Sequence, residues 1–185
     1  MHKFNEIRVI TWLVIGSSLV LGAGIAHADT NDDPVTERLE RRSEEVRAKY
    51  TDVRHVTPEQ LLAMPGEPLL IDVREADEYG VSRLPNALHA PDRASLLALV
   101  EAAADRPVVV YCSLGVRSSE AARFLAEHGH DDVANLDGSI FRWANEGRPL
   151  VNDFGPTDRA HPYNLWWGRY LKRNLHEREP NIERR

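Results

Sequence analysis

Cysteine is almost absent from the sequence, with Cys112 as the single example in 185 residues. One cysteine excludes an internal disulfide. The eight histidines show no zinc-ligand spacing with a cysteine or carboxylate partner, so we expect no metal site. Positive charge is also scarce, because 23 Lys and Arg face 29 Asp and Glu for a net charge of −6. This acidic balance argues against nucleic acid as a partner.

Long apolar runs are limited to residues 9–26, which follow the basic residues Lys3 and Arg8 and end in Ala-His-Ala at 26–28. This pattern predicts a secretory signal peptide cleaved after Ala28, and therefore a periplasmic or extracellular protein. The alternative is an uncleaved anchor that holds the protein at the membrane, since the run is close to the shortest length that spans a bilayer. A lone thiol in an exported chain is exposed to oxidation, so its presence suggests that the thiol is used.

The length suits one domain with extensions at both ends. We divide the chain into a signal peptide (1–28), an N-terminal helical extension (29–50), a domain (51–151) and a C-terminal aromatic and basic extension (152–185). Strands and helices alternate within the domain, which predicts an α/β fold with a mainly parallel five-stranded sheet and helices on both faces. The expected strands are 53–56, 69–73, 87–89, 108–111 and 133–136, and the expected helices are 32–50, 58–64, 75–80, 92–104, 118–128 and 139–145.

Cys112 lies between a buried apolar strand and a helix, in the stretch CSLGVRSS. Gly115 allows a tight turn in which backbone N–H groups surround the sulfur, and the helix adds the positive end of its dipole. Arg117 supplies a permanent cation. These features predict an activated thiolate that faces an anion site. The alternative interpretation is that Cys112 is a small buried hydrophobic residue.

Four segments of the domain carry a resemblance to a known family. They are LLIDVREADEY (69–79), LPNALHAP (84–91), VVVYCSLGVRS (108–118) and GSIFRWANEGRPL (138–150). In this order they resemble a single rhodanese domain, the fold of thiosulfate and related sulfurtransferases. One segment departs from the family, because residues 81–87 read VSRLPNA where members usually have Gly-His-Ile-x-Gly-Ala. The rim of the pocket, and so the choice of substrate, is expected to differ.

The resemblance implies that Cys112 accepts sulfur as a persulfide and that Arg117 binds the anionic donor. The loop around the substrate would consist of Ser113, Leu114, Gly115, Val116 and Ser118. Asp72 and Arg74 are expected to support the site from behind, with Arg74 paired to Glu78 at the i, i+4 spacing.

The implied reaction moves sulfane sulfur from a donor such as thiosulfate to cyanide or a thiol, without a cofactor. An alternative is a non-catalytic or partner-dependent module that carries a persulfide or binds a partner. A cysteine phosphatase is a further rival, but its loop has five residues between cysteine and arginine, whereas four separate Cys112 from Arg117. The shorter loop suits one sulfur atom better than a tetrahedral phosphate.

The C-terminal extension contains five aromatic or apolar residues at helical spacing with basic residues beside them. They are Tyr163, Trp166, Trp167, Tyr170 and Leu171. The spacing predicts a helix that docks onto the domain. The alternative is a contact with a protein partner or with a membrane surface.

Overall fold

The computed structural model describes residues 33–103 and 106–177. The signal peptide expected at residues 1–28 lies outside this range. Within the described residues, every helix is too short or too polar to span a bilayer.

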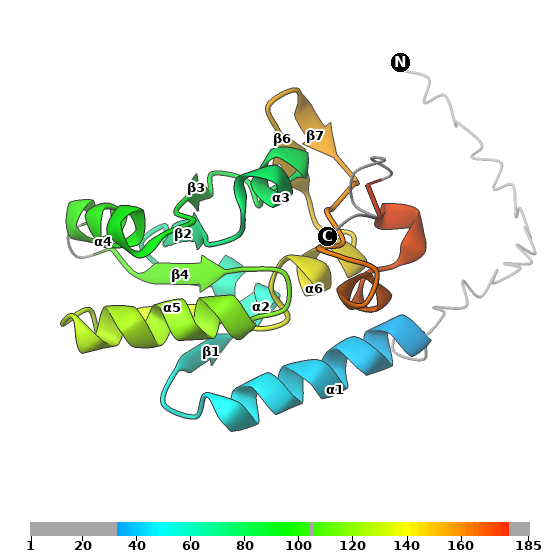
Figure 1. Ribbon diagram of the computed structural model, residues 1–185. Coiled ribbons are helices and arrows are strands. Elements are labelled where there is room, and N and C mark those ends of the chain that lie inside the picture. The colour runs from blue at the N-terminus through cyan, green and yellow to red at the C-terminus, as the bar shows by residue number, and fades with distance from the viewer. Residues whose placement is uncertain (1–32, 104–105, 178–185) are drawn as a thin grey trace, which may run out of the picture.

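Five parallel strands form the central sheet in the order β1-β5-β4-β2-β3 (Figure 1). The strands are β1 (Arg54–Val56), β2 (Leu69–Asp72), β3 (Leu88–His89), β4 (Val108–Tyr111) and β5 (Val133–Leu136). β4 lies at the centre and is buried along its whole length, as expected for an apolar run between two helical layers. The predicted α/β class and five-stranded parallel sheet are confirmed.

Helices connect the strands and begin close to the predicted positions. They are α1 (Pro34–Lys49), α2 (Pro58–Leu62), α3 (Ala76–Val81), α4 (Arg93–Ala102), α5 (Val116–Glu127) and α6 (Ser139–Asn145). Local capping explains several of these starts. Thr57 and Gln60 form a capping box at α2, and the Asp92 carboxylate accepts from the Ser95 amide at α4.

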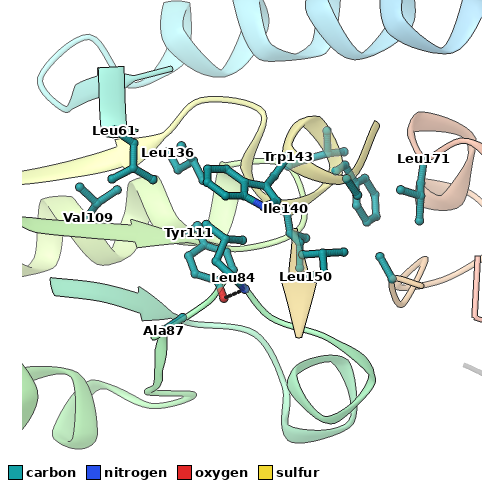
Figure 2. Packing of buried hydrophobic residues seen from close by; sticks show 14 of the residues in the cluster. Leu61, Leu84, Ala87, Val109, Tyr111, Leu136, Ile140, Trp143, Leu150 and Leu171 are labelled. Atoms are coloured by element: carbon teal, nitrogen blue, oxygen red, sulfur yellow. Dashed lines mark hydrogen bonds between the residues drawn. The ribbon is translucent and has the colours of Figure 1, made fainter. Parts of the chain in front are cut away.

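Two hydrophobic clusters fill the space on the two faces of the sheet. One contains residues of α2, α6 and the C-terminal segment, and Figure 2 shows part of it. Tyr111 lies inside this cluster, where its hydroxyl oxygen accepts a hydrogen bond from the Leu84 amide at 3.1 Å. The other cluster contains residues of α4 and α5. Helices therefore cover both faces, as the alternating sequence pattern predicts.

The N-terminal helix α1 is packed onto the domain. Leu39 belongs to the first cluster and Val46 to the second, so the helix contacts both sides of the core. Its charged face also makes specific contacts. Arg47 pairs with Asp137 at 2.6 Å, and Glu40 pairs with Arg142 of α6 at 2.5 Å.

The C-terminal segment docks onto the domain but does not form the predicted long helix. After an antiparallel hairpin of β6 (Leu150–Asn152) and β7 (Gly155–Thr157), its described part, which ends at residue 177, forms only two short 3-10 helices, η2 (Trp167–Tyr170) and η3 (Arg173–Leu175). Tyr163 has a left-handed backbone with φ of 66°, which is incompatible with a helix through this residue. The segment, orange to red in Figure 1, contacts α1 through η2.

Candidate active site

Cys112 is the first residue after β4, and α5 begins four residues later at Val116. The intervening turn depends on Gly115, whose φ of 108° is a left-handed conformation that glycine adopts without steric cost. The Cys112 side chain is only 2% exposed, so reagents reach the sulfur only through the pocket above it.

The N-terminus of α6 supports this loop from below. The amides of Ile140 and Phe141 donate to the carbonyl oxygens of Cys112 and Ser113, each at 3.2 Å. The Gly115 amide donates to the Cys112 sulfur at 3.1 Å. The loop therefore directs carbonyl groups toward α6 and a backbone donor toward the thiol, as the nest predicted from the sequence requires.

The pKa of Cys112 lies below its ordinary value. Burial of the sulfur acts to raise the pKa, but the positive charge of Arg117 and hydrogen bonds from the backbone amides of Ser118 and Gly115 outweigh this effect. Ser118 is held in turn by Asn135, whose Oδ1 accepts from the Ser118 hydroxyl at 2.6 Å. The site thus favours the thiolate, the form that acts as a nucleophile.

Arg117 forms a bidentate ion pair with Glu78 of α3. Its Nη1 and Nη2 donate to the two carboxylate oxygens at 2.7 and 2.8 Å. The Ser113 hydroxyl also donates to Glu78 at 2.8 Å. These bonds lower the pKa of Glu78 against the effect of its burial, so the carboxylate stays charged. The sequence did not identify Glu78 as a partner of Arg117.

The expected pairing of Arg74 with Glu78 is wrong. Arg74 precedes α3, which begins at Ala76, so the helical i, i+4 spacing does not apply to it. Its guanidinium instead donates to Asp72 at 2.6 Å and to the Ser82 carbonyl at 2.6 Å. Asp72 and Arg74 are both fully buried, and the carboxylate raises the pKa of Arg74. The pair ties the end of β2 to the end of α3 and does not line the pocket.

A pocket of about 130 Å³ opens above the sulfur. It is lined by Cys112, Ser113, Leu114, Val116, Arg117, Tyr163 and Trp167. Five of these belong to the stretch CSLGVRSS, in which the predicted loop residues Gly115 and Ser118 do not line the pocket. Tyr163 and Trp167 come from the C-terminal segment. The aromatic spacing marked these two residues for packing and gave no signal that they reach Cys112.

A larger hollow of about 560 Å³ lies between α1 and α6. Its lining includes Glu37, Glu40, Arg142 and Lys172 but no residue of the Cys112 loop. Because its described lining holds no cysteine, whereas the smaller pocket contains the thiol of lowered pKa, the smaller pocket is the candidate active site.

Comparison with known proteins identifies relatives of the domain that holds this pocket. The family model described as rhodanese-like domain matches residues 57–146. A sulfurtransferase of Allochromatium vinosum is 38% identical over 92 residues, which cover 50% of this chain and 86% of the relative. A thiosulfate sulfurtransferase GlpE of Actinobacillus succinogenes is 32% identical over 102 residues, covering 54% of this chain and 92% of that protein.

Solved structures support the fold. A thiosulfate sulfurtransferase from Pseudomonas aeruginosa superposes with a TM-score of 0.51 at 24% identity. The match covers 71% of this chain and 26% of that one, so this chain spans about a quarter of the length of that protein. At this identity the likeness concerns the fold alone.

Proposed function

The chain belongs to the rhodanese-like domain family, and we propose that this rhodanese-type sulfurtransferase carries sulfane sulfur as a persulfide on Cys112. The observation that carries the proposal is the lowered pKa of the Cys112 thiol. The sulfur accepts a hydrogen bond from the Gly115 amide at 3.1 Å and lies in a pocket that Arg117 also lines. A thiolate in such a setting is a nucleophile for a sulfur atom that bears a good leaving group.

In the first step, the Cys112 thiolate attacks the outer sulfur of a donor such as thiosulfate. The new bond joins the two sulfur atoms, the bond between the outer sulfur and the sulfonate sulfur breaks, and sulfite leaves with the electron pair. The persulfide keeps one negative charge. The Gly115 amide holds the attacking sulfur, and the Arg117 guanidinium lines the same pocket, where a cation stabilises the charge that shifts onto the outer sulfur.

In the second step, cyanide or a thiolate attacks the outer sulfur of the persulfide. The sulfur–sulfur bond to Cys112 breaks, and its electron pair returns to the Cys112 thiolate, so neither an external oxidant nor a reductant is consumed. Ser118 and Gly115, which lower the pKa of the free thiol, also make Cys112 a better leaving group in this step.

The test measures thiocyanate formation from thiosulfate and cyanide by the purified full chain, together with the mass of the protein after exposure to thiosulfate alone. We expect turnover, and a gain of one sulfur atom that disappears in the Cys112→Ser variant. If neither product nor persulfide forms, the proposal is wrong. If the persulfide forms without turnover until a partner protein is added, the chain acts as a partner-dependent carrier instead.

We also propose that the protein is exported, on the basis of the basic, apolar and Ala-His-Ala pattern of residues 1–28. Expression of the full chain with a C-terminal tag, followed by cell fractionation and N-terminal sequencing, tests the proposal. A mature protein that begins at Asp29 supports export with cleavage. A full-length protein in the membrane fraction supports the uncleaved anchor, and a full-length protein in the cytosol contradicts export.

A further inference from the structure

Part of the wall of the Cys112 pocket comes from outside the family-matched residues. The family match ends at residue 146, whereas the wall includes Tyr163 and Trp167 of the C-terminal segment. The pocket is therefore completed by a segment that the shared domain does not supply.

Trp167 is held in place from two sides. It packs against the first hydrophobic cluster, and the Arg42 guanidinium of α1 lies 5.2 Å from the centre of its ring. The residues that follow are fixed to α6, because Asn145 donates to the Tyr170 carbonyl at 2.8 Å and accepts from the Lys172 amide at 2.9 Å. Trp167 thus forms a fixed part of the wall.

Tyr163 lies on the Arg117 side of the pocket. The guanidinium carbon of Arg117 is 4.8 Å from the centre of the tyrosine ring, within cation–π range. The left-handed backbone at Tyr163, with φ of 66°, is unusual for an aromatic residue. It is stabilised by a hydrogen bond of 2.9 Å from the Tyr163 amide to His161 Nδ1. Such a conformation persists where the surrounding structure enforces it.

We propose that Tyr163 and Trp167 are specificity-determining residues that restrict the persulfide on Cys112 to small thiol acceptors with a short apolar body. The inference rests on the proposed function. Tripeptide thiols such as glutathione, and cysteines on the surface of folded proteins, are excluded by size.

The pocket is small. A volume of about 130 Å³ is well below the roughly 300–1,000 Å³ of ordinary small-molecule sites, so only a group of a few non-hydrogen atoms fits inside it. Because Cys112 is 2% exposed, an acceptor must enter this pocket to reach the sulfur.

The wall of the pocket is largely apolar. Four of the lining side chains, Leu114, Val116, Tyr163 and Trp167, present carbon-rich surfaces. The one cation among the described lining residues, Arg117, is paired with Glu78 and lies beside the Cys112 sulfur, so the wall offers no further cation to the charges of an acceptor. An acceptor with an apolar body gains binding free energy when it displaces water from these surfaces. The charged groups of a tripeptide would lose their hydration there without forming new hydrogen bonds or ion pairs.

The test loads the full chain with sulfur from thiosulfate, removes the donor, and measures the rate of persulfide transfer to 2-mercaptoethanol and to glutathione. In the wild type we expect 2-mercaptoethanol to react much faster than glutathione at equal thiolate concentration. Trp167→Ala and Tyr163→Ala should each raise the glutathione rate relative to the 2-mercaptoethanol rate by about tenfold.

Trp166→Ala is the matched control, because Trp166 adjoins Trp167 in sequence but is 64% exposed and does not line the pocket. This variant should keep the wild-type ratio. Tyr163 is 36% exposed, so Tyr163→Ala decides the question even if the loss of Trp167 impairs folding. A wild type without size preference, or a ratio unchanged by Tyr163→Ala, overturns the inference.

Alkylation of the free Cys112 thiol separates this inference from the proposed function, because it needs no persulfide. The ratio of the rates for a bulky fluorescein iodoacetamide and for iodoacetamide itself should rise about tenfold in Tyr163→Ala and remain unchanged in Trp166→Ala. If no persulfide forms but this ratio rises, the proposed function fails while the role of the wall stands. If the persulfide forms but the ratio does not move, the role of the wall fails alone.

Discussion

Arg117 of α5 and Glu78 of α3 form two parallel hydrogen bonds of 2.7 and 2.8 Å, 39 residues apart in the chain. Glu78 is 1% exposed, whereas the Arg117 side chain is 31% exposed and reaches the Cys112 pocket. The buried carboxylate fixes the orientation of the cation beside the sulfur. The position of the Arg117 charge therefore depends on Glu78, which does not line the pocket, and this dependence can be tested.

Glu78→Gln should destabilise the fold by about 2 kcal/mol at pH 7, because it removes the charge that compensates a partly buried arginine. Urea unfolding monitored by circular dichroism measures the change. Glu101→Gln, on the exposed side of α4, is the control and should change stability by less than about 0.5 kcal/mol. Equal stabilities of the two variants would show that the ion pair contributes nothing.

The same pair predicts a dependence of stability on pH. The folded pKa of Glu78 is lowered by Arg117, so its contribution is complete above the unfolded value of about 4.3 and is lost as the pH falls through the folded pKa. The difference in unfolding free energy between wild type and Glu78→Gln should thus be constant from pH 7 to pH 5 and shrink below pH 4. A difference that grows on acidification would contradict the assigned direction of the shift.

Replacement of Arg117 should raise the pKa of Cys112, since the positive charge of Arg117 is the largest influence that lowers it. The rate of alkylation by iodoacetamide, measured against pH, reports the thiolate. We expect a wild-type midpoint below the ordinary thiol value of about 8.5 and a higher midpoint in Arg117→Ala.

Two further variants identify the cause. Arg117→Lys keeps the charge without the bidentate geometry and should give an intermediate midpoint. The double variant Arg117→Ala with Glu78→Gln removes the carboxylate that the single change leaves unpaired. If its midpoint returns to the wild-type value, the stranded Glu78 charge, and not the loss of Arg117, explains the shift in the single variant.

The sequence was sufficient for the sheet and for the Cys112 loop because both depend on local signals. An apolar run as short and rich in valine as 108–111 favours a buried central strand, and Gly115 marks the turn that follows it. The sequence failed where a contact joins distant segments. Glu78 was paired with Arg74 by a helical spacing, but the helix begins after Arg74, and Asp72 is the nearer carboxylate.

The C-terminal segment shows the same limit. Its aromatic residues have helical spacing, but the Asn164 side chain accepts from the amides of Trp166 and Trp167 at 3.0 Å and forms a turn in place of a helix. Periodicity shows which residues can share one face of a helix. It cannot detect a side chain that accepts hydrogen bonds from backbone amides and so replaces the helical hydrogen bonds. The approach of Tyr163 and Trp167 to Cys112 follows from this turn, so the pattern could not predict it.

Tyr111→Phe tests the packing beneath the site. The Tyr111 side chain is fully buried and its oxygen accepts from the Leu84 amide at 3.1 Å (Figure 2). Loss of the hydroxyl leaves a buried N–H without this partner, which should cost about 1–3 kcal/mol in unfolding free energy. Tyr163→Phe, on an exposed side chain, is the control for stability. A Tyr111→Phe protein as stable as the wild type would show that water replaces the lost acceptor.

Gly115→Ala should remove most of the sulfurtransferase activity, whereas Gly129→Ala should not, because only the first substitution brings a side chain against a neighbouring residue. Both glycines have left-handed backbones, with φ of 108° and 87°, so alanine at either position should cost about 1–2 kcal/mol of stability. At Gly129 a new Cβ meets no atom within 4 Å, whereas at Gly115 it comes within 3.2 Å of Asn135 Nδ2.

Asn135 cannot move freely, because its Oδ1 accepts a 2.6 Å hydrogen bond from the hydroxyl of Ser118, a residue whose backbone amide helps to lower the pKa of Cys112. The strain in Gly115→Ala must therefore displace either the loop or the hydrogen bonds around the sulfur. We expect persulfide formation from thiosulfate to fall by at least about tenfold in Gly115→Ala and to stay near the wild-type rate in Gly129→Ala. Equal rates in the two variants, at similar stability, would mean that the geometry of the loop around the thiol does not control the reaction.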